Sequence, residues 1–199
     1  MRVIIFLSLY FAFCELLGQT TDELNQQAIE LSRKGETRQA IKTIDKSLRA
    51  DPDKKETHFA YGLILMAKND VKAAESRFLK AIQLDSAYAD PYDYLSIIYF
   101  QGHDLNRALE CFDKSISIRP TIIRLLGRAD IRAMLGDYAG SMRDCDDLLM
   151  LDPKNPNAYF TRGNAKFGLR DKDGACADLR RAIELGKPKD AFFSKYCEN

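Results

Sequence analysis

The sequence predicts an all-α fold built from five repeated helix pairs, and three observations support this prediction. Small residues recur every 33 or 34 residues in one column, namely Ala40, Ala74, Ala108, Ser141 and Ala175. Three further columns keep the same register along the chain. A fixed period of this length is typical of solenoid proteins, whose repeats pack only against their neighbours. The chain has 199 residues and is 46% hydrophobic and 30% charged, which indicates a folded protein rather than a disordered one.

The first 18 residues predict a secretory signal peptide ahead of the repeats. Arg2 provides a positive start, and the apolar run VIIFLSLYFAFC follows at residues 3–14. A run of about twelve residues is shorter than the roughly 20 that a membrane-spanning helix needs. Gly18 is the small residue expected at a cleavage site, so cleavage is expected to leave Gln19 as the first residue.

Two alternatives to a cleaved signal stay open. In the first, the segment remains attached and serves as an N-terminal membrane anchor. In the second, Cys14 becomes a lipidated N-terminus of the bacterial kind, although such signals favour a small residue where Phe13 stands.

Each repeat is expected to form two helices, A and B, joined by a short turn. In helix B the small-residue column is followed at i+4 and i+7 by two more columns, so that all three lie on one face. The i+4 column holds Ile44, Phe78, Phe112, Cys145 and Leu179, and the i+7 column holds Ser47, Ala81, Ser115, Leu148 and Ala182. Small residues at both ends of this face let a neighbouring helix approach, and the larger residue between them fills the space.

Separate columns mark the turn and the two ends of each helix B. The turn column is Gly35, Asn69, His103, Gly136 and Arg170, and Gly, Asn and His tolerate a positive φ better than Arg does. The next column is Glu36, Asp70, Asp104, Asp137 and Asp171, in which Asp is a strong N-cap. Proline closes three of the repeats, at Pro52, Pro120 and Pro153. Thr20 and Glu23 have the spacing of a capping box before the first helix.

The columns divide residues 19–189 into five repeats, at about 21–54, 55–88, 89–121, 122–155 and 156–189. The fourth repeat is one residue shorter, which places the deletion in the turn after Pro120. The fifth repeat lacks the closing proline and has Gly186 instead. Residues 190–199 are expected to form a short capping helix, because Phe192, Phe193 and Tyr196 put apolar groups on one side of it.

This pattern resembles the tetratricopeptide repeat (TPR) family, most closely in the residues from Leu135-Gly136-Asp137-Tyr138 to Leu151-Asp152-Pro153. The resemblance implies a right-handed solenoid of antiparallel helix pairs with a concave groove that binds proteins. The stretch from Gly174 to Cys197 is similar to the C-termini of exported TPR proteins of Gram-negative bacteria. This second resemblance implies a protein of the periplasm or cell envelope, where the protein can associate with an envelope complex.

The sequence lacks the motifs of the common catalytic and metal-binding classes. It contains no glycine-rich nucleotide motif, no GxSxG, no HExxH and no CxxC. Four acidic residues form a cluster that lies largely on one helix B, namely Asp144, Asp146, Asp147 and Asp152. The cluster lacks the glycine-bearing loop of calcium sites, so we interpret it as a solvated helix face rather than a metal site. His58 is interpreted as a packed or solvated side chain and His103 as a turn residue. The sequence therefore predicts no enzyme, no metal, no cofactor and no small-molecule substrate.

The charge balance argues against nucleic acid as a partner, since 30 Lys and Arg residues face 29 Asp and Glu residues. The TPR resemblance instead implies a groove lined by the second, fifth, ninth and twelfth positions of each helix A. The candidate partner-binding residues at these positions are Phe59, Leu63, Met66, Asp93, Ile97, Phe100, Leu126, Asp130, Phe160, Asn164 and Phe167. Together they predict an apolar strip edged with carboxylates that binds a peptide or a helix of a protein partner. The alternative is that some of them only pack between neighbouring helices.

Two classes of function follow from this sequence. One is an exported scaffold that binds a partner segment in its groove, and the other is a structural or assembly subunit of a cell-envelope complex. The chaperone-binding role of some family members is excluded, because Asn25 and Ile29 stand in the first repeat where the terminal-carboxylate site needs a lysine.

The cysteines predict one possible disulfide. Cys176 lies near the start of the last helix B, and Cys197 ends the capping helix that is expected to fold back over it. Such a return can bring the two Cα atoms to the roughly 5.5–6 Å that a disulfide requires. The alternative is two free thiols. Cys111 and Cys145 are interpreted as small buried hydrophobic residues.

Overall fold

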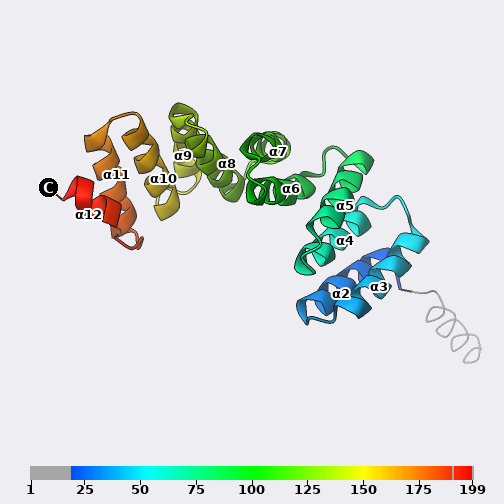
Figure 1. The fold of residues 1–199 in the computed structure, drawn as a ribbon. Coiled ribbons are helices and arrows are strands. Elements are labelled where there is room, and N and C mark those ends of the chain that lie inside the picture. Colours follow the sequence, from blue (N-terminus) through cyan, green and yellow to red (C-terminus); the bar gives the residue numbers. More distant parts are fainter. Residues whose placement is uncertain (1–18, 190, 199) are drawn as a thin grey trace, which may run out of the picture. The chain divides into compact units, whose positions relative to one another are not determined.

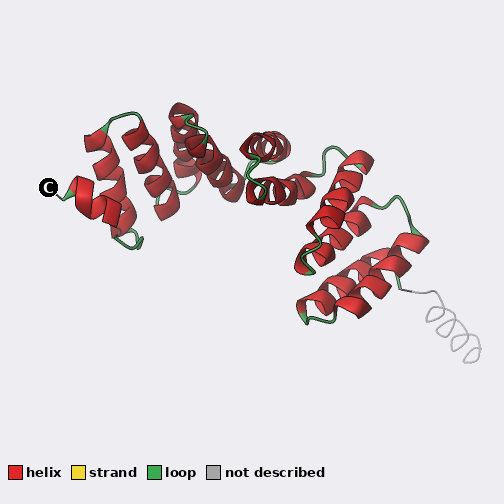
Figure 2. Ribbon diagram, in the orientation of Figure 1, coloured by secondary structure: helices red, strands yellow, loops and turns green. Residues whose placement is uncertain are grey.

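The computed structural model describes residues 19–189 and 191–198, so the predicted signal peptide lies outside the described residues. Within these ranges the chain forms eleven helices, labelled α2 to α12 in Figure 1, and no strand (Figure 2). The helices follow one another as packed pairs joined by short turns. The predicted all-α class of helix-turn-helix repeats is confirmed.

The first compact unit ends at Ser86, and its described part consists of two helix pairs. The four helices are α2 (Thr21–Arg33), α3 (Thr37–Ala50), α4 (Lys55–Ala67) and α5 (Val71–Leu84). Helix α4 packs against α2 and α3 of the first pair as well as against its own partner α5. This stacking of helix A on helix A is what a repeat protein uses to build a continuous core.

The second compact unit starts at Ala87 and contains three helix pairs and the terminal helix within its described residues. These helices are α6 (Ala89–Gln101), α7 (Leu105–Ile118), α8 (Ile122–Met134), α9 (Tyr138–Leu151), α10 (Pro156–Gly168), α11 (Lys172–Glu184) and α12 (Ala191–Cys197). Helix α8 packs against α7 and α10, and α12 packs against α11.

The predicted capping residues start the helices at which the columns placed them. Thr20 and Glu23 form the complete capping box, with the Thr20 N–H donating to the Glu23 carboxylate at 2.8 Å and the Glu23 N–H donating to Thr20 Oγ1 at 3.3 Å. The four aspartates of the N-cap column all accept a backbone N–H from the first turn of their helix, at Asp70, Asp104, Asp137 and Asp171. Glu36, the exception in that column, makes no such bond.

The turn before each helix B has a left-handed residue, as the turn column predicts. The φ angles are 80° at Gly35, 63° at Asn69, 61° at His103, 82° at Gly136 and 67° at Arg170. Arg170 therefore adopts the same conformation as the glycines despite its Cβ, because the helices on both sides fix the geometry of the turn.

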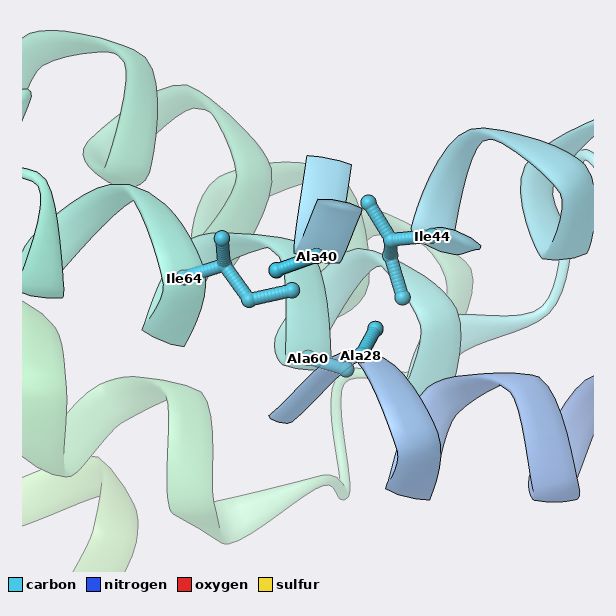
Figure 3. Packing of buried hydrophobic residues seen from close by; sticks show 5 residues of the cluster. All are labelled: Ala28, Ala40, Ile44, Ala60 and Ile64. Carbon is cyan, nitrogen blue, oxygen red and sulfur yellow. The ribbon is translucent and has the colours of Figure 1, made fainter. Parts of the chain in front are cut away.

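The core of the first unit is a layer of small and branched residues between its two helix pairs. Figure 3 shows this cluster, which consists of Ala28, Ala40, Ile44, Ala60 and Ile64. The alanines allow close approach, and Ile44 and Ile64 fill the remaining space with no more than 1% of their surface exposed. In the same unit, a Cβ atom on Gly62 would lie 2.4 Å from the Phe78 ring, so glycine is what lets α4 approach α5.

Buried ion pairs tie helix A to helix B in the second unit. Asp144 of α9 is 1% exposed and accepts from Arg128 at 2.6 and 3.0 Å and from Arg132 at 2.8 Å. One repeat later, Asp178 of α11 accepts two bonds from Arg162, both at 2.8 Å. The interpretation of the acidic cluster as a solvated face is therefore wrong for Asp144, since the arginines of α8 cover its carboxylate.

The surroundings of Asp178 show which interaction dominates in these pairs. Burial raises the pKa of this carboxyl group, but hydrogen bonds from Arg162 and Lys166 lower it by more, so the net pKa lies below the ordinary value. The ionised form is the one that the folded protein favours.

His58 is a packed side chain at the start of α4. It is 4% exposed, and its Nε2 lies 2.8 Å from the carbonyl oxygen of Pro52. Because a carbonyl oxygen only accepts, Nε2 must carry the proton, and Nδ1 is left without a hydrogen-bond partner. Burial lowers the pKa of His58, and the bond to Pro52 offsets this only in part.

We expect this histidine to make the folded protein less stable in mild acid. Because its pKa is lower in the folded than in the unfolded chain, the unfolded chain binds the proton first, and stability is lost as the pH falls below about 6.5 toward the folded pKa. Tyr159 occupies the same repeat position, and its hydroxyl reaches the Pro153 carbonyl at 3.2 Å. His58→Tyr is therefore the matched control.

The measurement is denaturant unfolding of both proteins at pH 7.5 and pH 5. The wild-type protein is expected to lose more stability over this interval than His58→Tyr. An equal loss in the two proteins would mean that His58 is protonated at no cost in the folded chain.

Candidate functional site

Two neighbouring cavities open along the helix A face of the second unit. The first, which we call the apolar cavity, has a volume of about 170 Å³ and lies between α6, α7 and α8. Its lining consists of Ser96, Ile97, Phe100, Phe112, Gly127, Asp130, Ile131 and Met134. Three of the apolar side chains remain substantially exposed, Ile97 at 42%, Phe100 at 44% and Met134 at 58%. These side chains have no structural neighbour that covers them fully, so they are available to a partner.

Phe112 of α7 forms part of the wall of the apolar cavity and lies against Gly127 of α8. A Cβ atom on Gly127 would lie 2.5 Å from Cζ of the Phe112 ring, so only glycine at this point of α8 leaves room for the ring. Ser96, on the opposite wall, is 1% exposed and turns its hydroxyl back to the Asp93 carbonyl at 2.6 Å. The cavity wall on that side is therefore less polar than the residue type suggests.

The second cavity, which we call the polar cavity, has a volume of about 190 Å³ and lies between α8 and α10. It is lined by Leu126, Asp130, Asn157, Phe160, Thr161, Asn164 and Lys187. The Lys187 ammonium group lies 4.8 Å from the centre of the Phe160 ring, within the range of a cation–π contact. The polar cavity thus combines an aromatic wall with two side-chain amides and a cation.

Asp130 is shared by both cavities. Its Oδ1 accepts a hydrogen bond from Thr161 Oγ1 at 2.8 Å. Partial burial beside the two cavities raises the pKa of the carboxyl group, whereas the Thr161 bond and the charge of Lys187 act in the opposite direction. The carboxylate is therefore a hydrogen-bond acceptor in a partly dehydrated position.

The structure brings six of the eleven predicted groove residues to these two cavities. They are Ile97, Phe100, Leu126, Asp130, Phe160 and Asn164. Leu63 and Met66 lie half-buried on α4 of the first unit, as does Phe59, whose ring centre is 5.9 Å from that of Phe78.

Asp93 and Phe167 are engaged by other parts of the protein. The Asp93 carboxylate accepts from Nε and Nη2 of Arg124 at 2.7 to 2.9 Å, so it is an internal ion-pair partner. The Phe167 ring packs on Tyr196 of α12 with 5.1 Å between ring centres. For these two residues the alternative of packing between helices describes the structure.

Sequence reasoning missed Arg124. Only 3% of this residue is exposed, and its guanidinium also bonds Asp90 at 2.9 Å and the Arg119 carbonyl at 2.7 Å. The corresponding repeat positions hold Glu23, Thr57, Pro91 and Ala158. The one signal for Arg124 was a basic residue in a column that holds no other basic residue.

The C-terminal cysteines are bonded in the structure. Cys176 and Cys197 form a disulfide with their Cα atoms 5.3 Å apart, and Phe193 of the same terminal helix is 7% exposed. Cys145 is fully buried, and burial raises the pKa of its thiol to about 12.

Residues 19–189 and 191–198 contain no cluster of three metal-ligating side chains. None of their helices combines the length and the apolar character that crossing a membrane requires.

Comparison with known proteins identifies the repeats. Models of the tetratricopeptide repeat match residues 25–93 and 156–185. Tetratricopeptide repeat protein 6 of Homo sapiens is 26% identical over 75% of this chain and 29% of its own length. DnaJ homolog subfamily C member 7 of Homo sapiens is 25% identical over 77% of this chain and 34% of its own length. The chain thus spans about a third of these relatives.

Solved structures share the fold. YrrB is described as a TPR protein with an unusual peptide-binding site. Its structure superposes on this one with a TM-score of 0.74 at 18% sequence identity, and the match covers 88% of this chain and 90% of the YrrB chain. PilW, described as a type IV pilus biogenesis factor, covers 88% of this chain and 82% of its own with a TM-score of 0.71 at 17% identity. The repeat matches place the chain in the tetratricopeptide repeat family, and these solved structures share its fold.

Proposed function

We propose that this protein is an exported, non-catalytic scaffold that binds a peptide or a helix of a protein partner along α6, α8 and α10. The observation that supports this proposal is the pair of adjacent cavities, one apolar and one polar, on the same helix A face. Exposed apolar side chains beside a few convergent polar groups are typical of a recognition site. A protein-interaction role is also what the TPR fold supports.

The solved neighbours add support at the level of the fold. The structure of YrrB is described as having a peptide-binding site, and that protein shares this architecture at 18% identity. A TPR array of this size is therefore compatible with peptide recognition.

Binding is expected to depend on Phe100. Its side chain is 44% exposed and lines the apolar cavity, so Phe100→Glu places a charge where a partner buries apolar surface. Burying such a side chain contributes about 1.5–3 kcal/mol, so affinity for a partner captured from a host extract is expected to fall about tenfold or more. Leu169→Glu is the matched control, since Leu169 is 50% exposed and lies outside both cavities.

Circular dichroism separates loss of binding from loss of folding. Both variants are expected to keep the wild-type helix content. If the wild-type protein and Phe100→Glu are both folded and capture equal amounts of the partner, the groove is not the binding site. Phe167→Glu is unsuitable as a test, because Phe167 packs on the terminal helix.

Two features support export. Residues 1–18 have the pattern of a secretory signal, and a disulfide between Cys176 and Cys197 belongs to an oxidising compartment. The intact mass of the protein purified from its own host is expected to correspond to a chain that begins at Gln19. A mass that still includes Met1 would contradict cleavage and favour the anchor.

A structural subunit of an envelope complex is the second candidate, and one observation favours it. Ile123, Met150 and Leu151 are 81%, 75% and 60% exposed at the start of α8 and the end of α9, outside both cavities. A permanent interface at these residues predicts that the chain purifies only together with its complex. A monodisperse monomer would favour the scaffold.

A further inference from the structure

The size of the apolar cavity limits what it can hold. A cavity of about 150 Å³ lined by aliphatic and aromatic groups accommodates benzene, and this one measures about 170 Å³. One phenylalanine or leucine side chain therefore fits, whereas a methyl group leaves most of the space empty. The lining of Ile97, Phe100, Phe112, Ile131 and Met134 matches such a group in polarity.

The edge of the apolar cavity supplies a hydrogen-bond acceptor. Oδ1 of Asp130 is used by Thr161, while Oδ2 accepts no hydrogen bond from the residues that the structure describes. A carboxylate beside an apolar cavity complements a group in which an N–H donor adjoins an apolar side chain. The main-chain amide of a peptide residue has this arrangement.

The polar cavity continues the same chemistry on the other side of Asp130. Asn157 and Asn164 each offer a side-chain amide with both donors and an acceptor, and both residues are exposed. A peptide main chain presents N–H and C=O groups in alternation, so it can pair with such amides. Lys187 adds donors for a carbonyl oxygen.

From these two cavities we propose that the site binds an extended peptide by one anchor residue, phenylalanine or leucine, whose side chain fills the apolar cavity while its main-chain N–H donates to Asp130. The neighbouring main chain then runs across α8 into the polar cavity, where Asn157 and Asn164 pair with it. This inference rests on the proposed function and specifies the chemistry of the partner segment.

The smallest probe that carries all the required groups is N-acetyl-L-phenylalanine amide. We expect it to bind the full chain with a dissociation constant on the order of 1 mM, as suits a ligand of this size. Binding is measured by nuclear magnetic resonance, from shifts of the Ile97, Ile131 and Met134 methyl signals. N-acetyl-L-leucine amide is expected to bind similarly, and the glycine amide at least fivefold more weakly.

Two variants separate the anchor from the main-chain contact. Ile97→Glu is expected to weaken the phenylalanine amide at least fivefold, and Leu169→Glu, the exposed control at the end of α10, is expected to leave binding unchanged. Asp130→Ala is expected to weaken the phenylalanine amide severalfold but not toluene, which has the ring and no amide. Since Ile97 and Asp130 are both exposed, each variant is expected to fold.

The outcomes distinguish this inference from the proposed function. Equal binding of the glycine and phenylalanine amides, or no shift at any of the three methyl groups, would overturn the anchor. If that happened while Phe100→Glu still failed to bind the host partner, the groove would remain the binding site, but it would not recognise the partner through an anchor residue. If the amides bound as expected while Phe100→Glu retained the partner, the cavity chemistry would stand and the proposed function would fail.

Discussion

Replacing Asp144 with alanine is expected to lower the free energy of unfolding by about 3–5 kcal/mol. The carboxylate is 1% exposed and is the common acceptor of Arg128 and Arg132, whose side chains are themselves only 16% and 19% exposed. Removing Asp144 leaves the two guanidinium groups with only the half-exposed carboxylates of Asp113 and Asp137 as counter-charges, and the loss of the buried acceptor makes the change costly.

The neighbouring aspartate provides the control. Asp146 is 54% exposed in its pair with Arg162, at 2.6 Å. An exposed ion pair contributes about 0–1 kcal/mol, so Asp146→Ala is expected to cost far less. Urea denaturation of the two variants measures the difference. Similar losses in both would mean that the Asp144 pairs are hydrated in solution.

Replacing Cys197 with serine is expected to destabilise the C-terminal end of the protein by about 3 kcal/mol. The bond closes a loop across a sequence separation of 21 residues. Helix α12 has seven residues, and an isolated helix of this length is unstable in water. Its attachment therefore depends on the disulfide together with Phe193 and the Phe167–Tyr196 contact.

Hydrogen exchange and peptide mapping test this expectation. The amides of residues 191–197 are expected to exchange faster in Cys197→Ser than in the oxidised wild type, and reductant is expected to abolish the difference. Non-reducing peptide mass spectrometry is expected to yield a Cys176–Cys197 linked peptide. Full alkylation of Cys197 in the folded, unreduced protein would contradict the bond, with the buried Cys145 as the internal reference for a protected thiol.

The local features of the fold were predictable because each depends on a few adjacent residues. A capping box or an aspartate N-cap requires only the right residue types at a fixed spacing, and the turn column requires only a residue that can adopt a positive φ. The repeat multiplies these signals fivefold, so that even Arg170, a poor choice for its turn, was placed correctly by its register.

The site was predictable only in part, since helix position does not specify what a side chain meets on the next helix. Position alone singled out Ile97, Phe100 and Asp130, which line the apolar cavity. Position did not indicate that Asp93 pairs with Arg124 one repeat later, or that Tyr196 contacts Phe167 from outside the repeats.

The apolar cavity itself depends on a contact that no column contains. Phe112 reaches α8 of the following repeat, whereas Phe78, its counterpart one repeat earlier, packs on Gly62 of its own repeat. The difference arises because Ser96 stands at the repeat position of Gly62, and Gly127 offers the open space instead. Periodicity predicts which positions are equivalent, but the rings at the equivalent positions 78 and 112 lie against different helices.

The most direct test of the central claim is photo-cross-linking from inside the apolar cavity. A photoreactive phenylalanine analogue at position 100 is expected to cross-link the partner in host extract, while the same analogue at position 123, on the exposed start of α8, is expected to give no product. A product is expected from position 100 alone, and excess N-acetyl-L-phenylalanine amide is expected to reduce its yield. A partner that cross-links from position 123 and not from position 100 would contradict it.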